Sequence, residues 1–368
     1  MSVAKIRVLV VDDSNFMRKA IANLLARDPG IEVVGKARSG EEALDLIPQV
    51  DPDVVTLDLE MRGLSGLETL ERIMAEFPRP VLMLSAYTRE GAEVTLEALR
   101  RGAVDFLEKP SGVVSLDMHM VAQHLIDKIK IAKRSTPRRP AMVSPVTSLP
   151  PPDLRPARPP APRPARRSRR LGNPAESVLV VAASTGGVQA LQVVLGGLPA
   201  NWPLPTIVVQ HMPPHFTQSL AADMNRALPL RVVEAEDGML LEKGTIYIAP
   251  GGLHTLVAPA HHNPGRQTIR LSEAPTETFL RPAADVTMLA AADVFGENAI
   301  GVVLTGMGTD GALGLKAMHD RGAITFAQDR ETSVIYGMPK AAAEAGAVDE
   351  VLALDQIAPA CRSAVGLD

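Results

Sequence analysis

Three side chains with the chemistry of a hydrolase follow apolar runs in the C-terminal half of the sequence. Ser184 comes after the run 178–183, His211 after the run 206–210, and Asp310 shortly after the run 299–304. A hydroxyl, an imidazole and a carboxylate can act as nucleophile, general base and orienting group, and imidazole titrates near neutrality. If the three runs are strands that end at one sheet edge, these residues predict a Ser-His-Asp triad.

Each piece of this triad also has a structural explanation. The segment Ser184–Gly187, which precedes a predicted helix over 188–195, is equally typical of a helix N-cap or an anion-binding loop. A glycine-flanked aspartate such as Asp310 is often a turn residue. The dinucleotide pattern Gly-x-Gly-x-x-Gly is absent from this segment.

Other histidines compete with His211 for the role of base. They are His215, His254, His261, His262 and His319. We expect His254 in a loop after Pro250-Gly251-Gly252, and His261 with His262 at an exposed hairpin tip. His211 is favoured because it directly follows a strand, which holds it rigidly. A metal site is disfavoured, since no His-x-x-x-His pair on a predicted helix with a supporting acid occurs.

A second set of reactive residues lies at the ends of apolar runs in the N-terminal third. It comprises Asp12, Asp13, Asp58, Ser85 and Lys109. Three carboxylates placed together favour a hard cation such as Mg2+, and a carboxylate can itself accept a phosphoryl group. Helix caps and turns are the structural alternative for any one of them, but five matching positions favour the phosphoryl-transfer site.

Strand-like and helix-like segments alternate along both halves of the chain. In the N-terminal half the predicted strands are 6–11, 31–34, 54–59, 81–85 and 104–107, and the predicted helices include 17–25, 41–47 and 90–100. Such alternation predicts a parallel sheet covered on both faces, with ligands at the carboxyl ends of its strands. The fold class is therefore α/β, with two doubly wound parallel-sheet domains.

A change of composition divides the two domains. Residues 134–174 contain twelve of the 31 prolines and ten arginines against one aspartate. Dense proline forbids helix, and few large apolar residues are present to offset the entropy of ordering. We interpret 134–174 as a flexible linker between domains over 1–133 and 175–368; a basic tether for an acidic partner is the alternative.

Composition excludes several other classes of protein. The chain has 368 residues, 46% of them hydrophobic, but only 3% aromatic, which disfavours a base-stacking nucleic-acid platform. Cys361 is the only cysteine, so neither an internal disulfide nor a cysteine-based zinc site is possible. No signal peptide and no membrane span are evident. We expect a soluble, cytoplasmic protein that does not bind nucleic acid.

Residues 1–133 resemble the receiver domain of two-component response regulators, with its flavodoxin-like fold. The resemblance implies that Asp58 accepts phosphate, that Asp12 and Asp13 with Asp58 hold Mg2+, and that Lys109 contacts the phosphate. It also implies that Ser85 and Phe106 respond as switch residues. One departure lies after Asp58, where receivers commonly have proline and an Asp-Gly turn but this chain has Arg62-Gly63-Leu64-Ser65.

The C-terminal segments resemble the chemotaxis protein-glutamate methylesterases. The motifs are Ser184-Thr185-Gly186-Gly187, Gln210-His211-Met212-Pro213-Pro214 and Thr305-Gly306-Met307-Gly308-x-Asp310-Gly311. The resemblance implies a Rossmann-like domain, the triad Ser184, His211 and Asp310, and an oxyanion and substrate neighbourhood made by Thr185, Gly186, Met307, Tyr247 and Met338. Familiar members carry His-Arg-Pro-Ser where this chain has Leu280-Arg281-Pro282-Ala283, a difference expected to affect receptor contacts.

Together the two resemblances imply a phosphorylation-regulated serine hydrolase. It would remove methyl groups from glutamate methyl esters, and deamidate glutamines, on methyl-accepting chemotaxis receptors. Its phosphodonor would be a histidine kinase of a chemotaxis-like pathway, its receiver would use Mg2+, and ester hydrolysis would need no cofactor. The alternative is a non-catalytic response regulator whose output domain binds a partner protein.

Overall fold

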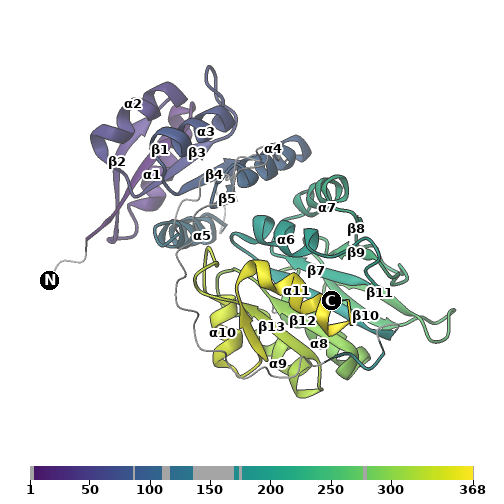
Figure 1. The fold of residues 1–368 in the computed structure, drawn as a ribbon. Coiled ribbons are helices and arrows are strands. Elements are labelled where there is room, and N and C mark those ends of the chain that lie inside the picture. Colours follow the sequence, from purple (N-terminus) through teal and green to yellow (C-terminus); the bar gives the residue numbers. More distant parts are fainter. Residues whose placement is uncertain are drawn as a thin grey trace, which may run out of the picture.

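The computed structural model describes residues 4–85, 88–109, 117–135, 170–173, 176–276 and 280–367. Two parallel sheets organise the molecule, one in each half of the chain (Figure 1). Most of the linker predicted over 134–174 lies outside the described residues. At its end, Leu171 is buried, and its N–H donates to the Ala364 carbonyl of the C-terminal domain.

The N-terminal sheet has five parallel strands in the order β2-β1-β3-β4-β5. Its strands are β1 (Ile6–Val11), β2 (Ile31–Ala37), β3 (Val54–Asp58), β4 (Val81–Ser85) and β5 (Asp105–Glu108). The helices are α1 (Asn15–Leu25), α2 (Gly40–Val50), α3 (Gly66–Glu76), α4 (Arg89–Arg100) and α5 (Asp117–Ala132). The predicted strands and helices are confirmed, with ends that differ by a few residues.

Local chemistry starts the helices of this domain where the sequence places small polar residues. The side chains of Ser14, Ser39 and Ser65 accept hydrogen bonds from backbone N–H groups at the starts of α1, α2 and α3. Ser65 and Glu68 bond reciprocally as a capping box. These caps end the loops that follow β1, β2 and β3, so the loops are held against the sheet edge.

The C-terminal sheet has seven parallel strands in the order β14-β13-β12-β6-β7-β9-β8. They are β6 (Val178–Ala183), β7 (Thr206–Gln210), β8 (Arg231–Glu234), β9 (Thr245–Ile248), β12 (Ala299–Val303), β13 (Ile324–Gln328) and β14 (Glu350–Leu352). A separate antiparallel hairpin is formed by β10 (His254–Pro259) and β11 (Gln267–Ser272). Both predicted doubly wound sheets are therefore present.

Helices cover both faces of the C-terminal sheet. They are α6 (Gly187–Gly196), α7 (Phe216–Ala227), α8 (Ala284–Phe295), the short 3-10 helix η2 (Gly296–Asn298), α9 (Ala312–Asp320), α10 (Met338–Glu344) and α11 (Leu354–Ala364). In β6, Leu179 and Val181 belong to one apolar core and Val178 and Val180 to the other. Alternate side chains of a strand point to opposite faces, so this all-apolar run is buried on both sides.

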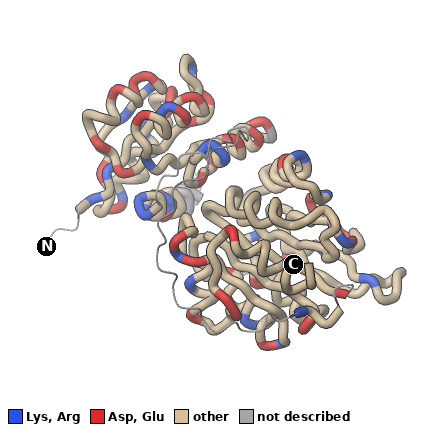
Figure 2. Tube along the Cα trace, viewed as in Figure 1, with Lys and Arg blue, Asp and Glu red and all other residues tan. Residues whose placement is uncertain are grey.

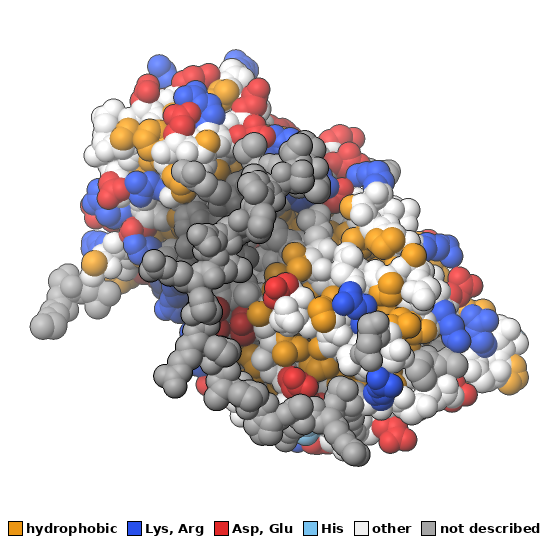
Figure 3. Space-filling model, viewed as in Figure 1, with side chains coloured by type: hydrophobic (Ala, Val, Ile, Leu, Met, Phe, Trp, Pro, Cys, Tyr) orange, Lys and Arg blue, Asp and Glu red, His pale blue; other side chains and the backbone are white. Residues whose placement is uncertain are grey.

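The two domains contact one another through the receiver-side helix α4, which packs against α6 and α7. In Figure 1, α4 extends from the N-terminal sheet towards α7. Acidic and basic residues both lie along α4 in Figure 2. On the face drawn in Figure 3, exposed hydrophobic side chains of the C-terminal domain form several separate patches. Among the described residues, no helix combines the length and the apolar character needed to cross a bilayer.

Candidate active site

The triad candidates follow three adjacent strands. Strand β6 pairs in parallel with β12 on one side and with β7 on the other. Ser184 directly follows β6, His211 directly follows β7, and Asp310 lies in the loop between β12 and α9. Because carboxyl ends of parallel strands meet at one sheet edge, the order β12-β6-β7 brings the three residues to one place.

Glycines bring the backbone close to Ser184. The N–H of Ser184 donates to the Thr305 carbonyl at 3.0 Å. A Cβ on Gly306 would lie 2.8 Å from Ser184 Cβ and would overlap the buried Met338 side chain. Gly186 has a φ of +78° and begins α6, and a Cβ there would lie 2.6 Å from Val334 Cβ. A side chain at Gly306 would collide with Ser184, and one at Gly186 would collide with Val334, which explains the glycines at these two positions.

A short polar contact joins the side chains of His211 and Asp310. His211 Nε2 lies 2.7 Å from Asp310 Oδ2. A carboxylate accepts, so this bond places the ring proton on Nε2 and leaves the lone pair on Nδ1. Ser184 and His211 line the same small space, but in the described part of the chain no hydrogen bond joins their side chains. The candidate base is oriented by Asp310, and the candidate nucleophile lies beside it with no hydrogen bond between these two described side chains.

Asp310 is held by backbone donors as well as by the histidine. The N–H groups of Ala284 and Asp285, at the start of α8, donate to its two oxygens at 2.6 and 2.9 Å. Burial alone would raise the pKa of Asp310, but the bond from His211 and these N–H groups outweigh burial and lower the pKa. The carboxylate therefore stays ionised beside the imidazole.

The competing histidines lie elsewhere. His261 and His262 are exposed in the turn between β10 and β11, as predicted. The expected loop position of His254 is wrong: His254 is the first residue of β10 and is fully buried. The residues from His254 onwards pair with β11. The glycine-rich sequence before them conceals the start of this strand. His215 precedes α7 and His319 lies in α9.

The other predicted neighbours of the triad differ in their positions. Met307 is 42% exposed, and Met338 is buried behind Gly306. Tyr247 lies in the core, where its hydroxyl donates to the Leu240 carbonyl and accepts from the Glu242 N–H. The structure thus gives Tyr247 a packing role in β9, and its hydroxyl bonds neither Ser184, His211 nor Asp310.

The N-terminal sheet gathers its reactive residues in the same way. Ligand atoms of Asp12, Asp13 and Asp58 all lie within 4.8 Å of one another. Lys109 Nζ is 2.6 Å from Asp58 Oδ1 and 3.5 Å from Asp12 Oδ2. The Oδ2 atoms of Asp12 and Asp58 are buried and accept no hydrogen bond. These oxygens are hard donors with unused lone pairs, so the cluster can hold a divalent metal ion.

Burial raises the pKa of Asp58 to about 6, although Lys109 acts in the opposite direction.

The predicted switch residues lie nearby and face the rest of the molecule. Ser85 is buried and donates to the Gly91 carbonyl in α4, and Thr95 donates to Ser85 at 2.8 Å. Phe106 is buried and stacks on Phe216 of α7, with ring centroids 4.5 Å apart.

Residues of the N-terminal domain cover the sheet edge at which Ser184 and His211 lie. Thr185, next to Ser184, donates its hydroxyl to Asp105 Oδ2 at 2.6 Å, and Lys128 binds the same carboxylate oxygen at 2.5 Å. Gln189 of α6 donates to the Leu99 carbonyl at the end of α4. The space that Ser184 shares with His211 is also lined by Leu99, Asp105 and Phe106, and it measures about 10 Å³. That is room for about one water molecule.

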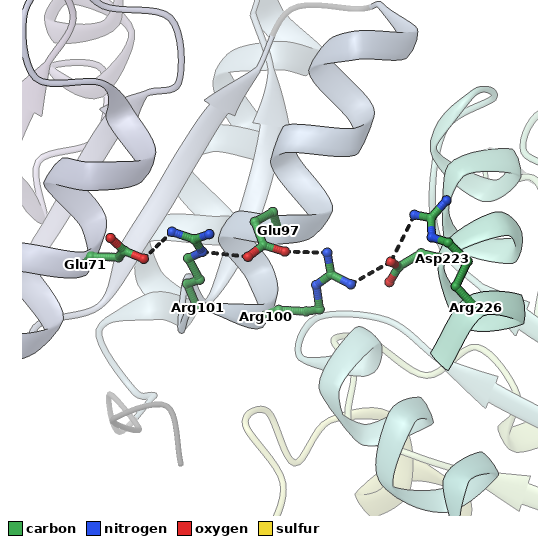
Figure 4. Close-up of polar contacts among 6 residues, drawn as sticks. All are labelled: Glu71, Glu97, Arg100, Arg101, Asp223 and Arg226. Atoms are coloured by element: carbon green, nitrogen blue, oxygen red, sulfur yellow. Dashed lines mark hydrogen bonds and ion pairs between the residues drawn. The ribbon is translucent and has the colours of Figure 1, made fainter. Parts of the chain in front are cut away.

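A chain of alternating charges crosses the same interface (Figure 4). Starting on α3 it runs through α4 to α7, in the order Glu71, Arg101, Glu97, Arg100, Asp223 and Arg226. Arg100 lies 2.5 Å from the buried Asp223 of the C-terminal domain. Sequence reasoning missed these residues and Asp105, because each reads as an ordinary helix or strand residue until the domains are docked.

Comparison with known proteins divides the chain in the same two parts. Residues 8–120 match the response regulator receiver domain, and residues 179–361 match the CheB methylesterase family. The protein-glutamate methylesterase/protein-glutamine glutaminase 1 of Oleidesulfovibrio alaskensis is 43% identical over 98% of this chain and 99% of its own length. The protein-glutamate methylesterase/protein-glutamine glutaminase of Symbiobacterium thermophilum is 46% identical over 98% of this chain and 97% of its own length.

Among solved structures, the catalytic domain of the Thermotoga maritima CheB methylesterase is 39% identical, with a TM-score of 0.48, and covers 50% of this chain and 95% of its own. The full-length relatives and both domain matches agree in order and extent. This chain therefore belongs to the protein-glutamate methylesterase/protein-glutamine glutaminase family, with an N-terminal response regulator receiver domain.

Proposed function

We propose that Ser184, His211 and Asp310 are the triad with which this chain hydrolyses glutamate methyl esters, and deamidates glutamines, on methyl-accepting chemotaxis receptors. The observation that carries this assignment is the 2.7 Å bond between His211 and Asp310 beside Ser184, at the carboxyl ends of three adjacent strands. The proposal agrees with the names of the chain's full-length relatives.

In the proposed reaction, His211 Nδ1 removes the proton of Ser184 as Ser184 Oγ attacks the γ-carbonyl carbon of the substrate. The negative charge that develops on the carbonyl oxygen is met by backbone donors, to which we assign the Met307 N–H. When the tetrahedral intermediate collapses, the bond from its carbon to the leaving group breaks, and the imidazolium gives its proton to the methoxy oxygen, which leaves as methanol, or to the amide nitrogen of a glutamine, which leaves as ammonia. Water then hydrolyses the acyl-enzyme, with the same imidazole as base.

Asp310 stabilises the imidazolium in this scheme. Its charge is kept by the N–H groups at the start of α8 and by the bond from His211, which outweigh burial, and its attraction for the ring strengthens when His211 gains a proton. The neighbouring Thr185 and Gly186 shape the turn that presents Ser184, and Met338 keeps Gly306 against it. No group outside the chain is needed for these proton transfers.

We propose Asp58 as the phosphate acceptor of the receiver domain. Asp12, Asp13 and Asp58 would hold Mg2+, which neutralises charge on the incoming phosphoryl group. Lys109 would contact the phosphate from its present position beside Asp58. Ser85 and Phe106 would transmit the change, since Ser85 bonds α4 and Phe106 packs on α7. The donor would be a histidine kinase of a chemotaxis-like pathway.

We further propose that the receiver domain holds the hydrolase closed until Asp58 is phosphorylated. The space of about 10 Å³ above Ser184 is too small for an ester group and is walled by Leu99, Asp105 and Phe106. Reversing a 99:1 preference for the closed state requires about 5.5 kcal/mol of differential stabilisation. We propose a cytoplasmic location, which the proposed partner classes and the free, buried Cys361 support.

The experiment that tests the triad is the substitution Ser184→Ala. We expect ester hydrolysis to fall on the order of 10^6-fold, with the fold retained, because the nucleophile is lost and only the oxyanion donors remain. Mass spectrometry of methylated receptor, incubated with each protein, measures the loss of methyl groups. A fluorophosphonate probe should label Ser184 in the wild type. Wild-type turnover by Ser184→Ala would reject the assigned nucleophile, and absent labelling under all phosphorylation conditions would favour a non-catalytic, partner-binding output domain.

A further inference from the structure

His254 is a buried, ionisable residue that the proposed reaction does not use. It begins β10 and has no exposed surface. Its ring bonds two backbone groups that are eight residues apart: Nε2 lies 3.3 Å from the Pro275 carbonyl, and Nδ1 lies 3.3 Å from the Ala283 N–H. The imidazole therefore ties both ends of the segment that leads from β11 into α8.

The tied segment ends at the donors that hold Asp310. Ala283 is the N-cap residue of α8 and has no side chain that can cap the helix. The next two N–H groups, those of Ala284 and Asp285, donate to the Asp310 carboxylate. Asp310 thus takes the place of a capping side chain, and the position of the helix start sets the position of Asp310. His254 fixes the residue immediately before those donors.

The two hydrogen bonds of His254 require the neutral ring. Nε2 must carry the proton to donate to Pro275, and Nδ1 must be unprotonated to accept from Ala283. Burial lowers the pKa of His254, which keeps the ring neutral near pH 7. The charged groups that act on it are Arg281 and Asp310, while its cross-strand neighbour on β11 is the uncharged Ser272.

We propose that His254 is a positioning residue for the triad: by accepting the Ala283 N–H it sets the start of α8, and through that helix start it places Asp310 against His211. This inference rests on the proposed function of Asp310. It assigns a role to a histidine that touches neither Ser184 nor His211. It also explains how the α8 start stays ordered although Ala283 cannot cap it.

Two substitutions separate this role from simple packing. In His254→Asn the side-chain oxygen can lie where Nδ1 lies and can still accept from Ala283, whereas in His254→Gln the amide reaches the Nε2 position and the Nδ1 acceptor is lost. The full-length chain is assayed after phosphorylation, with ester hydrolysis measured against pH. We expect His254→Asn to stay within about threefold of wild type and His254→Gln to lose about 10- to 100-fold in kcat.

The pH profile supplies the readout that a packing defect would not move. A misplaced Asp310 stabilises the imidazolium less, so His254→Gln should shift the acid limb of the profile to lower pH by about half a unit or more. Val194→Ala is the control for a loss of packing, because Val194 is buried in the apolar core on the face of the sheet opposite α8. This variant should be destabilised but should leave the acid limb of the pH profile unchanged. In an Asp310→Ala background, His254→Gln should cost less than about twofold.

Equal rates and equal acid limbs for the Asn and Gln variants would overturn the inference. So would a full, additive loss in the Asp310→Ala background. Failure of the proposed function looks different, because the wild type itself would then lack ester hydrolysis. In that case an NMR titration of the His211 ring in wild type and His254→Gln still decides the inference: an unchanged pKa of His211 rejects it.

Discussion

At the scale of single residues, Asp58 shows how a reactive group is placed at a cost to stability. It has 1% exposure, and burial raises its pKa from 3.8 to about 6. A raised acid pKa means that the folded state binds the proton more tightly than the unfolded state does. The contribution of Asp58 to the free energy of unfolding of the metal-free protein should therefore fall as pH rises from about 4 to 6, by at most about 3 kcal/mol, and then level off.

We expect Asp58→Asn to remove this pH-dependent loss. In EDTA at pH 7.5 the variant should be more stable than wild type by about 1 to 3 kcal/mol, because the amide needs no ionisation in a buried site. At pH 4 the two proteins should differ little. Urea unfolding of the receiver transition measures this difference. Addition of Mg2+ should stabilise wild type and not the variant. If the difference in stability between variant and wild type is the same at pH 7.5 as at pH 4, the raised pKa of Asp58 is contradicted.

The sequence predicts the triad because each member follows a strand that can be recognised from its apolar residues. Ser184, His211 and Asp310 are connected to β6, β7 and β12 by loops of at most six residues, so the sheet order alone unites them. The sequence predicts a loop at His254, because the glycines before it conceal the start of a strand. Its ring bonds backbone atoms of Pro275 and Ala283. Every residue carries these backbone atoms, so the residue types in the sequence do not indicate such bonds.

At the scale of elements, α4 joins the two domains through charge. Arg100 at its end pairs with Glu97 on the same helix and with Asp223 on α7. Asp223 is 5% exposed, and one of its oxygens has no hydrogen-bond partner. Removal of Arg100 leaves that buried carboxylate with only the longer contact to Arg226, at 3.4 Å. The Arg100 guanidinium therefore contributes part of the free energy that holds the two domains together.

We expect Arg100→Ala to raise the basal ester hydrolysis of the unphosphorylated protein. A loss of about 1 to 2 kcal/mol at this half-buried pair shifts the ratio of open to closed molecules about 5- to 30-fold. The fully phosphorylated rate should not change, since the interface is already open. Methanol release from methylated receptor measures both rates.

Arg72→Ala is the matched control for this prediction. Arg72 pairs with Glu76 at 2.8 Å within α3 and is half-exposed, and none of its described ion pairs crosses to the C-terminal domain. It should leave the basal rate unchanged. If both arginine variants, or neither, raise the basal rate, the contact between α4 and α7 does not contribute to closure. The spacing of apolar residues predicts the helix α4. The face with which α4 contacts the C-terminal domain cannot be predicted, because its charged residues would be equally stable if they were exposed to water.

At the scale of the whole molecule, one apolar cluster runs through both domains. It includes Leu96 and Phe106 from the receiver and Val188 and Phe216 from the C-terminal domain. The proposed switch residue Phe106 and residues beside the candidate site therefore pack in one continuous core. The sequence predicted both sheets, but not this continuity, because the contact depends on shapes that exist only after each domain has folded.

The closed arrangement predicts how accessible Ser184 is in each state. In the unphosphorylated chain the space beside Ser184 measures about 10 Å³, so a fluorophosphonate probe has no room to react until the domains separate. Phosphorylation of Asp58 should speed the labelling of Ser184 by at least about tenfold, in the presence of Mg2+ and a phosphodonor. Asp58→Asn should label at the slow rate under both conditions, because it cannot accept the phosphoryl group. Stopped-time labelling followed by mass spectrometry of the Ser184 peptide measures these rates. Fast labelling of the unphosphorylated protein, at the phosphorylated rate, would mean that the receiver does not restrict the hydrolase and that the interface with α7 serves another purpose.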